Sequence, residues 1–304
     1  MSESIVTIRG SRGDTDSGAP HTVDFRITGT CQLRCDWCWG PEHLRKGSIT
    51  EPQLKRTLGR LAADGTEQIV FSGGEPTLSK LLRPGVETAR ERGLRVTLST
   101  NGIKLAQHAD ILRYVDDLGI PIDGSNPEVN ERMRRRSDKF GAWDQAVGAI
   151  LLAQEMNQDG LADIAITSRT VIARPNLDDV ANIPGALEAE GVDIEAVRFK
   201  LYQVEPFGPH YADTDFERDW AISAQEAIEA AERTRAQAPD ANITLQLYEG
   251  TVGRYFLVDP DGFVEGTDED ASGYPIGVPY GNIVHNYEAT LGAYRAHQAQ
   301  IASY

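Results

Sequence analysis

Short apolar runs typical of buried strands alternate along the chain with longer stretches in which apolar residues recur at helical spacing. The strand-like runs lie at residues 23–28, 68–73, 95–100, 118–123, 162–172 and 196–204. The helical stretches between them lie at residues 51–64, 78–92, 104–115, 142–156 and 177–190. Strands that alternate with helices predict a parallel sheet with right-handed crossovers, either an open doubly wound sheet or a partial barrel. We therefore expect an α/β fold with function-bearing loops at the carboxyl ends of the strands.

The flanking segments differ from this alternating core, which we place at residues 21–209. Residues 1–20 are polar and rich in Gly, Ser and Asp, so they read as a flexible N-terminal leader. Residues 210–304 combine a helix at 222–237, a strand NITLQLYE, a DPDG turn and a last helix at 287–299. This pattern predicts a C-terminal α+β extension packed on the core.

Composition narrows the class of protein. With 40% hydrophobic and 25% charged residues the chain is typical of a globular domain. It has neither a long apolar run nor a signal peptide pattern, so we expect a cytoplasmic protein with no membrane partner. The formal net charge of -16 disfavours nucleic acid as a partner, because binding the phosphate backbone requires a basic surface.

The three cysteines of the chain, Cys31, Cys35 and Cys38, follow the first strand with the spacing C-x3-C-x2-C. A disulfide framework would normally use an even number of cysteines spread along the chain, so metal ligation is the better interpretation. Three thiolates can ligate three irons of a cubane and leave the fourth iron without a protein ligand. A zinc site completed by His43 is the alternative.

The segment CQLRCDWC, with Trp37 directly before the last cysteine, resembles the signature of the radical S-adenosylmethionine (SAM) superfamily. The resemblance implies a partial (β/α)6 TIM-like barrel that holds a 4Fe-4S cluster, with the amino and carboxylate groups of SAM on the fourth iron. It also implies reductive cleavage of SAM to a 5'-deoxyadenosyl radical, which abstracts hydrogen from a substrate carbon.

Two further segments are similar to SAM-binding motifs of this family. FSGGEPTL follows the second strand and resembles the GGEP motif, in which Gly73 and Gly74 allow close backbone approach and Glu75 meets the SAM ammonium group. STNG follows the third strand, where Thr100 and Asn101 are candidates for contacts with the SAM ribose or carboxylate. A helix N-cap turn is the alternative for these last two side chains.

IDGSNPEVNERMRRR and VRFKLYQVEPFGP resemble stretches of viperin-like and nucleoside-antibiotic enzymes of the same family. This resemblance implies that Asp123 ends the fourth strand at the SAM site and that Arg135 faces SAM. For the neighbouring arginines Arg132, Arg134 and Arg136 we expect a solvated basic helix face.

Alternation along the strands predicts which side chains face the barrel interior. Arg198, Lys200 and Tyr202 share one face of the sixth strand, and Arg169 on the fifth strand points the same way. Converging cations favour a small anionic substrate such as a nucleotide, nucleoside or sugar, and these four are the candidate substrate-site residues. The alternative is that the cations pair with internal acids, for which the candidates are Asp24, Asp123 and Glu205.

The lack of cysteine beyond residue 38 disfavours auxiliary clusters. We therefore expect a redox-neutral rearrangement, elimination or decarboxylation, with Tyr202, Tyr248 or Tyr255 as candidate hydrogen donors. A flavodoxin or ferredoxin would supply the electron. The alternatives are a peptide-modifying maturase or epimerase of the same family and a non-enzymatic iron-sulfur or zinc regulator.

Overall fold

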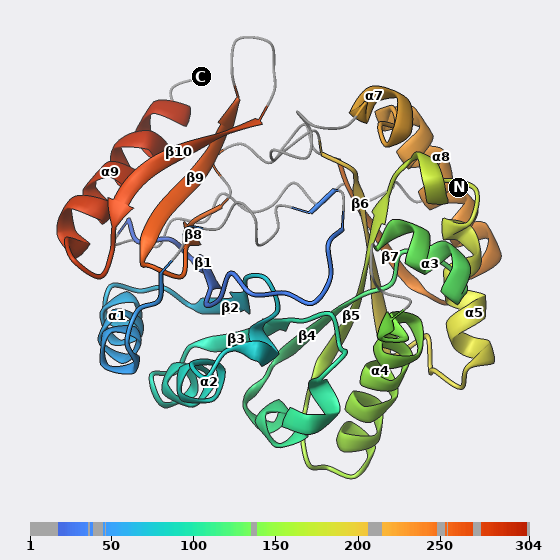
Figure 1. Cartoon of the computed structure of the whole chain (residues 1–304), viewed down its shortest axis with the longest axis horizontal. Coiled ribbons are helices and arrows are strands. Elements are labelled where there is room, and N and C mark those ends of the chain that lie inside the picture. The colour runs from blue at the N-terminus through green and yellow to red at the C-terminus, as the bar shows by residue number, and fades with distance from the viewer. Residues whose placement is uncertain are drawn as a thin grey trace.

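The computed structural model of the chain describes residues 18–35, 37–38, 45, 47–134, 139–205, 215–247, 253, 255–269 and 275–302. Within these ranges ten strands form one sheet in the order β10-β9-β8-β1-β2-β3-β4-β5-β6-β7 (Figure 1). The strands are β1 (Thr22–Arg26), β2 (Gln68–Ser72), β3 (Arg95–Ser99), β4 (Asp117–Pro121), β5 (Ala165–Ile172), β6 (Val197–Gln203), β7 (Asn242–Gln246), β8 (Leu257–Val258), β9 (Phe263–Glu269) and β10 (Pro275–Asn282). The parallel order of β1 to β6 confirms the predicted α/β fold.

Helices connect the parallel strands and cover the outside of the curved sheet, where Figure 1 shows α1, α2, α4 and α8. The helices are α1 (Glu51–Ala63), α2 (Leu82–Glu91), α3 (Pro127–Met133), α4 (Ala142–Gln158), α5 (Ile183–Ala189), α7 (Phe216–Asp219), α8 (Ala224–Gln237) and α9 (Tyr287–Ile301). The helix expected over 104–115 is a 3-10 helix, Leu105–Tyr114, with non-helical backbone angles at His108. The helix expected over 177–190 is divided between the 3-10 turn Val180–Asn182 and α5.

Helix α1 illustrates how the sequence produces these elements. Thr50 caps the helix by accepting a hydrogen bond from the Gln53 N–H, and the Gln53 side chain accepts one from the Thr50 N–H. Leu54, Leu58 and Leu61 recur at helical spacing and are fully buried. The helix is therefore specified at its start by a cap and along its length by one apolar face.

The residues after position 210 do not form a separate layer. Strand β7 pairs in parallel with β6, while β8 pairs in parallel with β1 at the opposite side of the core. Strands β9 and β10 continue from β8 in antiparallel order. The predicted extension thus supplies strands to both edges of the same sheet, and β7 adds a parallel strand to the six expected. With β7 and β10 as edges, the sheet of the described residues is open and not a closed barrel.

The hydrophobic core fills the space between the sheet and its helices, and its largest fully buried side chains include Phe25, Phe71 and Phe199. The burial pattern of β6 alternates as expected, with Val197, Phe199 and Leu201 inside this core. None of the helices in the described ranges has the length and apolar character needed to cross a membrane.

Candidate functional site

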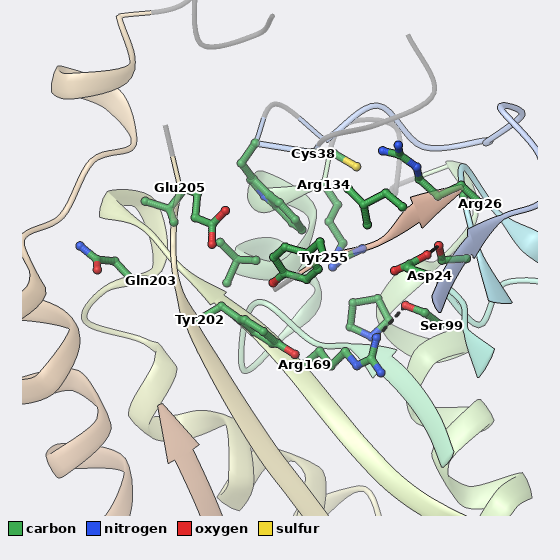
Figure 2. A pocket seen from close by; sticks show the side chains of 17 residues that line it. Asp24, Arg26, Cys38, Ser99, Arg134, Arg169, Tyr202, Gln203, Glu205 and Tyr255 are labelled. Carbon is green, nitrogen blue, oxygen red and sulfur yellow. Dashed lines mark hydrogen bonds between the residues drawn. The ribbon is translucent and has the colours of Figure 1, made fainter. Parts of the chain in front are cut away.

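A cavity of about 370 Å³ lies where the parallel strands end. Each of the strands β1 to β6 contributes to its wall, and among the lining residues are Arg26, Ser72, Ser99, Pro121, Arg169 and Tyr202. In Figure 2 Cys38 and Arg134 are drawn toward the upper side of the cavity, and Arg169 and Tyr202 toward the lower side. The predicted location of the function-bearing residues, at the carboxyl edge of the sheet, therefore coincides with the cavity.

The three cysteines lie on the loop that follows β1. Cys35 is buried, Cys31 and Cys38 are partly exposed, and Cys38 lines the cavity. The sulfur of Cys31 accepts hydrogen bonds from the Leu33 N–H at 3.4 Å and from Asn101 Nδ2 at 3.9 Å. Burial raises the pKa of both Cys31 and Cys35, although the Leu33 N–H opposes this for Cys31 and Arg134 opposes it for Cys35.

The donor set of this loop fits a cubane cluster. Among the described residues no three His, Cys, Asp or Glu side chains converge closely enough to hold a single metal ion. In a cubane each thiolate binds a different iron, so the sulfurs need not converge on one point. The zinc alternative relied on His43, which lies outside the described residues. Ligation by the three cysteines stays a prediction that the thiol chemistry and the adjoining cavity support.

Gly73 and Gly74 pack against the loop that leads to the cysteines. A Cβ atom on Gly73 would overlap the carbonyl oxygen of Thr28, and one on Gly74 would overlap that of Thr30. The N–H groups of Gly74 and Glu75 donate to these same oxygens, at 2.7 and 2.8 Å. The sequence predicted that the backbone at these glycines approaches a ligand closely. In the structure this backbone approaches the cysteine loop. Gly73 also lines the cavity.

Glu75 links the second and third strand-end motifs. Its fully buried carboxylate accepts hydrogen bonds from Thr100 Oγ1 at 2.6 Å and from the Asn101 N–H at 2.7 Å. Thr77 donates two more, from its N–H and its hydroxyl group. Because Asn101 also contacts the Cys31 sulfur, the SAM-site candidates Glu75, Thr100 and Asn101 are joined to the cysteine loop by one hydrogen-bond network.

Asp123 follows β4 and forms a buried ion pair with Arg134, at 2.5 Å between Oδ2 and Nη2. Arg134 is 5% exposed, lines the cavity and lies with its guanidinium 5.4 Å from the centre of the Trp37 ring. The prediction of a solvated Arg134 is therefore wrong: α3 ends at Met133, and the chain turns the next side chain inward. Arg132 is exposed and pairs with Glu128, as expected of a solvated face. Arg135 and Arg136 lie outside the described residues.

Arg169 enters the cavity from β5. Its Nη1 donates to Ser99 Oγ at 2.8 Å, as the dashed line in Figure 2 shows. A Cβ atom on Gly119 of β4 would overlap the Arg169 guanidinium, so this glycine leaves the space that the arginine occupies. Tyr202 also lines the cavity, whereas Lys200 does not and holds its Nζ 5.0 Å from the centre of the Tyr202 ring.

Arg198 does not converge with Arg169, which corrects the prediction. It lies at the start of β6, is exposed, and forms an ion pair with Asp117 at the start of β4. Alternation placed Arg198 on the expected face of the strand, but the cavity lies at the other end of that face. Its partner is also none of the three acids considered from the sequence.

Arg26 and Tyr255 are among the cavity residues that had no place in the predicted substrate site or SAM site. Arg26 of β1 is buried against two carboxylates, with Asp259 at 2.8 Å and Glu265 at 2.7 Å. Tyr255, considered only as a hydrogen donor, lines the cavity, and Gln246 Nε2 donates to its hydroxyl at 3.3 Å. Burial raises the pKa of Tyr255. Tyr248 lies outside the described residues.

Residues 25–183, slightly more than half of the chain, match the model of the Radical SAM superfamily. With the cysteine loop, the strand-end motifs and the curved parallel sheet, this match defines the class: the chain belongs to the radical SAM superfamily. Membership implies S-adenosylmethionine and a 4Fe-4S cluster as the cofactors, and it identifies the chain as a SAM-dependent iron-sulfur enzyme.

Several curated proteins are similar to the chain. An S-adenosylmethionine-dependent nucleotide dehydratase of Flammeovirga pacifica is 25% identical over 79% of this chain and 80% of that protein. Another, of Lacinutrix mariniflava, is 31% identical over 38% of this chain and 26% of its own length. A PqqA peptide cyclase of Rhodopseudomonas palustris is 29% identical over 60% of this chain and 48% of its own length. The first five curated relatives are matched over 26% to 48% of their length, so the chain spans half or less of those proteins.

Solved structures share the fold at low sequence identity. The structure of anSMEcpe with bound AdoMet has a TM-score of 0.65 and 14% identity, covering 91% of this chain and 82% of that one. SuiB of Streptococcus suis, bound to its precursor peptide SuiA, has a TM-score of 0.63 and 13% identity, covering 81% of this chain and 59% of that one.

Proposed function

We propose that the chain uses the 5'-deoxyadenosyl radical to abstract hydrogen from a small anionic molecule held in the cavity, with a nucleotide as the first candidate. The cofactors supply the radical chemistry when bound. The chain's own residues bind the substrate, orient the carbon that reacts, and exclude water.

The guanidinium of Arg169 is the observation that carries this proposal. It enters the cavity wall with Ser99 as its hydrogen-bond partner, and no described carboxylate lies within ion-pair distance. Its Nε is buried and has no hydrogen-bond partner among the described residues. Unused guanidinium donors in a cavity favour a carboxylate or phosphate ligand, which they can bind in bidentate geometry.

Asp24 is the competing partner for Arg169, because it lines the same cavity. Burial raises the pKa of Asp24, while Ser72, Arg26 and Arg169 oppose this rise. The carboxyl group already accepts a hydrogen bond from the Ser72 hydroxyl. Because Asp24 is bonded to Ser72 and forms no ion pair with Arg169 among the described residues, an anionic ligand would compete for the Arg169 guanidinium.

The similarity to nucleotide dehydratases supports a nucleotide within the class of small anions. The restriction of all cysteines to residues 31–38 supports an outcome that needs no second cluster in this chain, such as an elimination or rearrangement. A low-potential donor such as flavodoxin or ferredoxin would deliver the electron.

Deuterium transfer into 5'-deoxyadenosine tests the proposal. The anaerobically reconstituted enzyme is incubated with SAM, dithionite and ribose-deuterated nucleotides, with deuterated nucleosides and sugar phosphates in parallel. We expect transfer from an anionic member of this panel, and none in a Cys35→Ala control. Failure of every anionic compound, despite SAM cleavage, would reject the proposal.

Peptide modification is the second candidate, favoured by the similarity to PqqA peptide cyclase. The same assay separates the two, with deuterated peptides encoded beside the gene added to the panel. Transfer from a peptide alone would replace the small-molecule proposal.

A further inference from the structure

The ion pair between Asp123 and Arg134 lies beside the cysteine loop and has no role in the proposed substrate binding. The Asp123 side chain is fully buried and that of Arg134 is 6% exposed. Asp123 Oδ1 also accepts the Val171 N–H at 2.9 Å, and the Asp123 N–H donates to Asn130 Oδ1 at 3.0 Å. The contact from β5 fixes the carboxylate, and the contact from α3 fixes the backbone of Asp123.

Trp37 contacts both the arginine and the residue before it. Its indole N–H donates to the carbonyl oxygen of Met133 at 3.0 Å, and its ring lies 5.4 Å from the Arg134 guanidinium carbon. Since Trp37 directly precedes Cys38, the pair is coupled through one residue to a cysteine of the loop.

Stability alone does not account for this arrangement. A buried ion pair often contributes no more to folding than apolar residues of the same volume, because both charges must be desolvated. Moreover, Arg134 Nε is buried without a hydrogen-bond partner among the described residues. The arginine therefore places a buried positive charge in the cavity wall, which folding alone does not explain.

The pair presents its positive end to the cavity on the side of the cysteine loop. Arg134 and Cys38 both line the cavity and lie toward its upper side in Figure 2. Asp123 is not among the residues that line it. A positive charge held near a cluster stabilises the state that carries one more electron, as do hydrogen bonds to its sulfurs.

We infer that Arg134, positioned by Asp123 and Trp37, sets the reduction potential of the cluster held by Cys31, Cys35 and Cys38. In this role it raises the potential, so that one electron from a low-potential donor such as dithionite or reduced flavodoxin enters the cluster more readily. Arg134 acts through its charge and takes part in no bond that forms or breaks. The inference rests on the cofactor of the family and is independent of the substrate.

Redox titration of the reconstituted protein, monitored by electron paramagnetic resonance, tests this inference. We expect Arg134→Gln to lower the midpoint potential, so that the ratio of reduced to oxidised cluster at a fixed potential falls about tenfold, or 59 mV for one electron. Arg134→Lys retains the charge and should restore much of the loss. Arg132→Gln is the matched control, because Arg132 is exposed on the same helix and should leave the midpoint unchanged.

Asp123→Asn supplies a test with the opposite sign. Removing the negative end while keeping an oxygen for the Val171 N–H should raise the midpoint. If Arg134→Gln assembles a full iron complement and keeps the wild-type midpoint, the inference is wrong. If that variant does not assemble a cluster, Asp123→Asn decides: a raised midpoint supports the inference and an unchanged one overturns it.

Discussion

The amino and carboxyl ends of the parallel strands, here called the amino edge and the carboxyl edge, hold arginine ion pairs that differ in burial. At the amino edge Arg198 pairs with Asp117 and Arg90 pairs with Asp116, and both arginine side chains are more than 40% exposed. At the carboxyl edge Arg134 pairs with Asp123, and both side chains are nearly inaccessible to solvent. The same residue type is therefore a solvated surface charge at one edge and a buried charge at the other. Of these three ion pairs, only the buried pair of Asp123 and Arg134 adjoins the cysteine loop and the cavity.

The largest difference between the edges should appear in stability. Asp123→Ala leaves Arg134 buried without its carboxylate and removes the acceptor of the Val171 N–H, so we expect a loss of about 3–5 kcal/mol in the free energy of unfolding. Asp117→Ala, at the exposed pair, should cost no more than about 1 kcal/mol. Urea denaturation measures both. Equal losses in the two variants would show that the buried and the exposed ion pair do not differ in their contribution to stability.

Gly119→Ala tests the space that Arg169 occupies. The new methyl group would displace the guanidinium, and losing a charge-assisted hydrogen bond to an anionic substrate should lower kcat/KM roughly tenfold to a hundredfold. SAM cleavage without substrate should persist. Gly148→Ala in α4 is the control, since a Cβ there meets nothing within 4 Å and should stabilise the helix by about 0.5–1 kcal/mol. Unchanged kcat/KM in Gly119→Ala would show that the guanidinium does not hold the substrate.

Arg198→Gln tests whether the amino edge contributes to turnover. Because Arg198 is exposed and away from the cavity, we expect kcat/KM to stay within about twofold of wild type and stability to change by less than about 1 kcal/mol. A large loss of turnover would indicate that Arg198 belongs to the substrate site after all. Steady-state kinetics and urea denaturation of the same preparation give both quantities.

We expect the smallest effect on stability at the N-terminal cap of α8. This exposed ion pair can be compared with the buried pair at the carboxyl edge. Arg174 and the Ser223 N–H lower the pKa of Glu226 to about 2. A lowered pKa means that the ionised form stabilises the fold above the unfolded value of 4.5, and that this contribution is lost as the pH falls toward 2. Glu226→Gln should therefore be less stable at neutral pH by under about 1 kcal/mol, with a weaker pH dependence in this window. A stability profile parallel to that of wild type would contradict this.

Much of the fold was predictable from local patterns. The six predicted core strands fall within a few residues of β1 to β6, because alternation and turn residues mark strands directly. The joining of β7 to one edge and β8 to the other was not predictable, since both pairings depend on contacts distant in sequence. The extension therefore looked separate in the sequence but continues the sheet in the structure.

The candidate site was predictable where a motif and a strand end coincide. Glu75, Thr100, Asn101 and Asp123 are connected to the cysteine loop by the contacts that the structure shows. Their individual roles toward SAM stay predictions. Strand alternation identified the face on which Arg198 lies but not how far along the strand the cavity begins.

Arg134 was misassigned for a related reason. A run of arginines at the end of a short helix has the pattern of a solvated face, and only the turn after Met133 directs one of them inward. Its partner, Asp123, lies on a different element. The sequence offered one signal, the aromatic Trp37 before the last cysteine, but nothing in it showed that the ring packs on this arginine.

Deuterium transfer with and without phosphate on the substrate tests the account's central claim most directly. Transfer into 5'-deoxyadenosine is measured from a ribose-deuterated nucleotide and from its nucleoside, in wild type and in Arg169→Gln. We predict that wild type prefers the nucleotide by about tenfold or more, and that Arg169→Gln loses this preference while still cleaving SAM. No transfer from the nucleotide, or the same preference in both proteins, would contradict the assignment of the cavity to an anionic substrate.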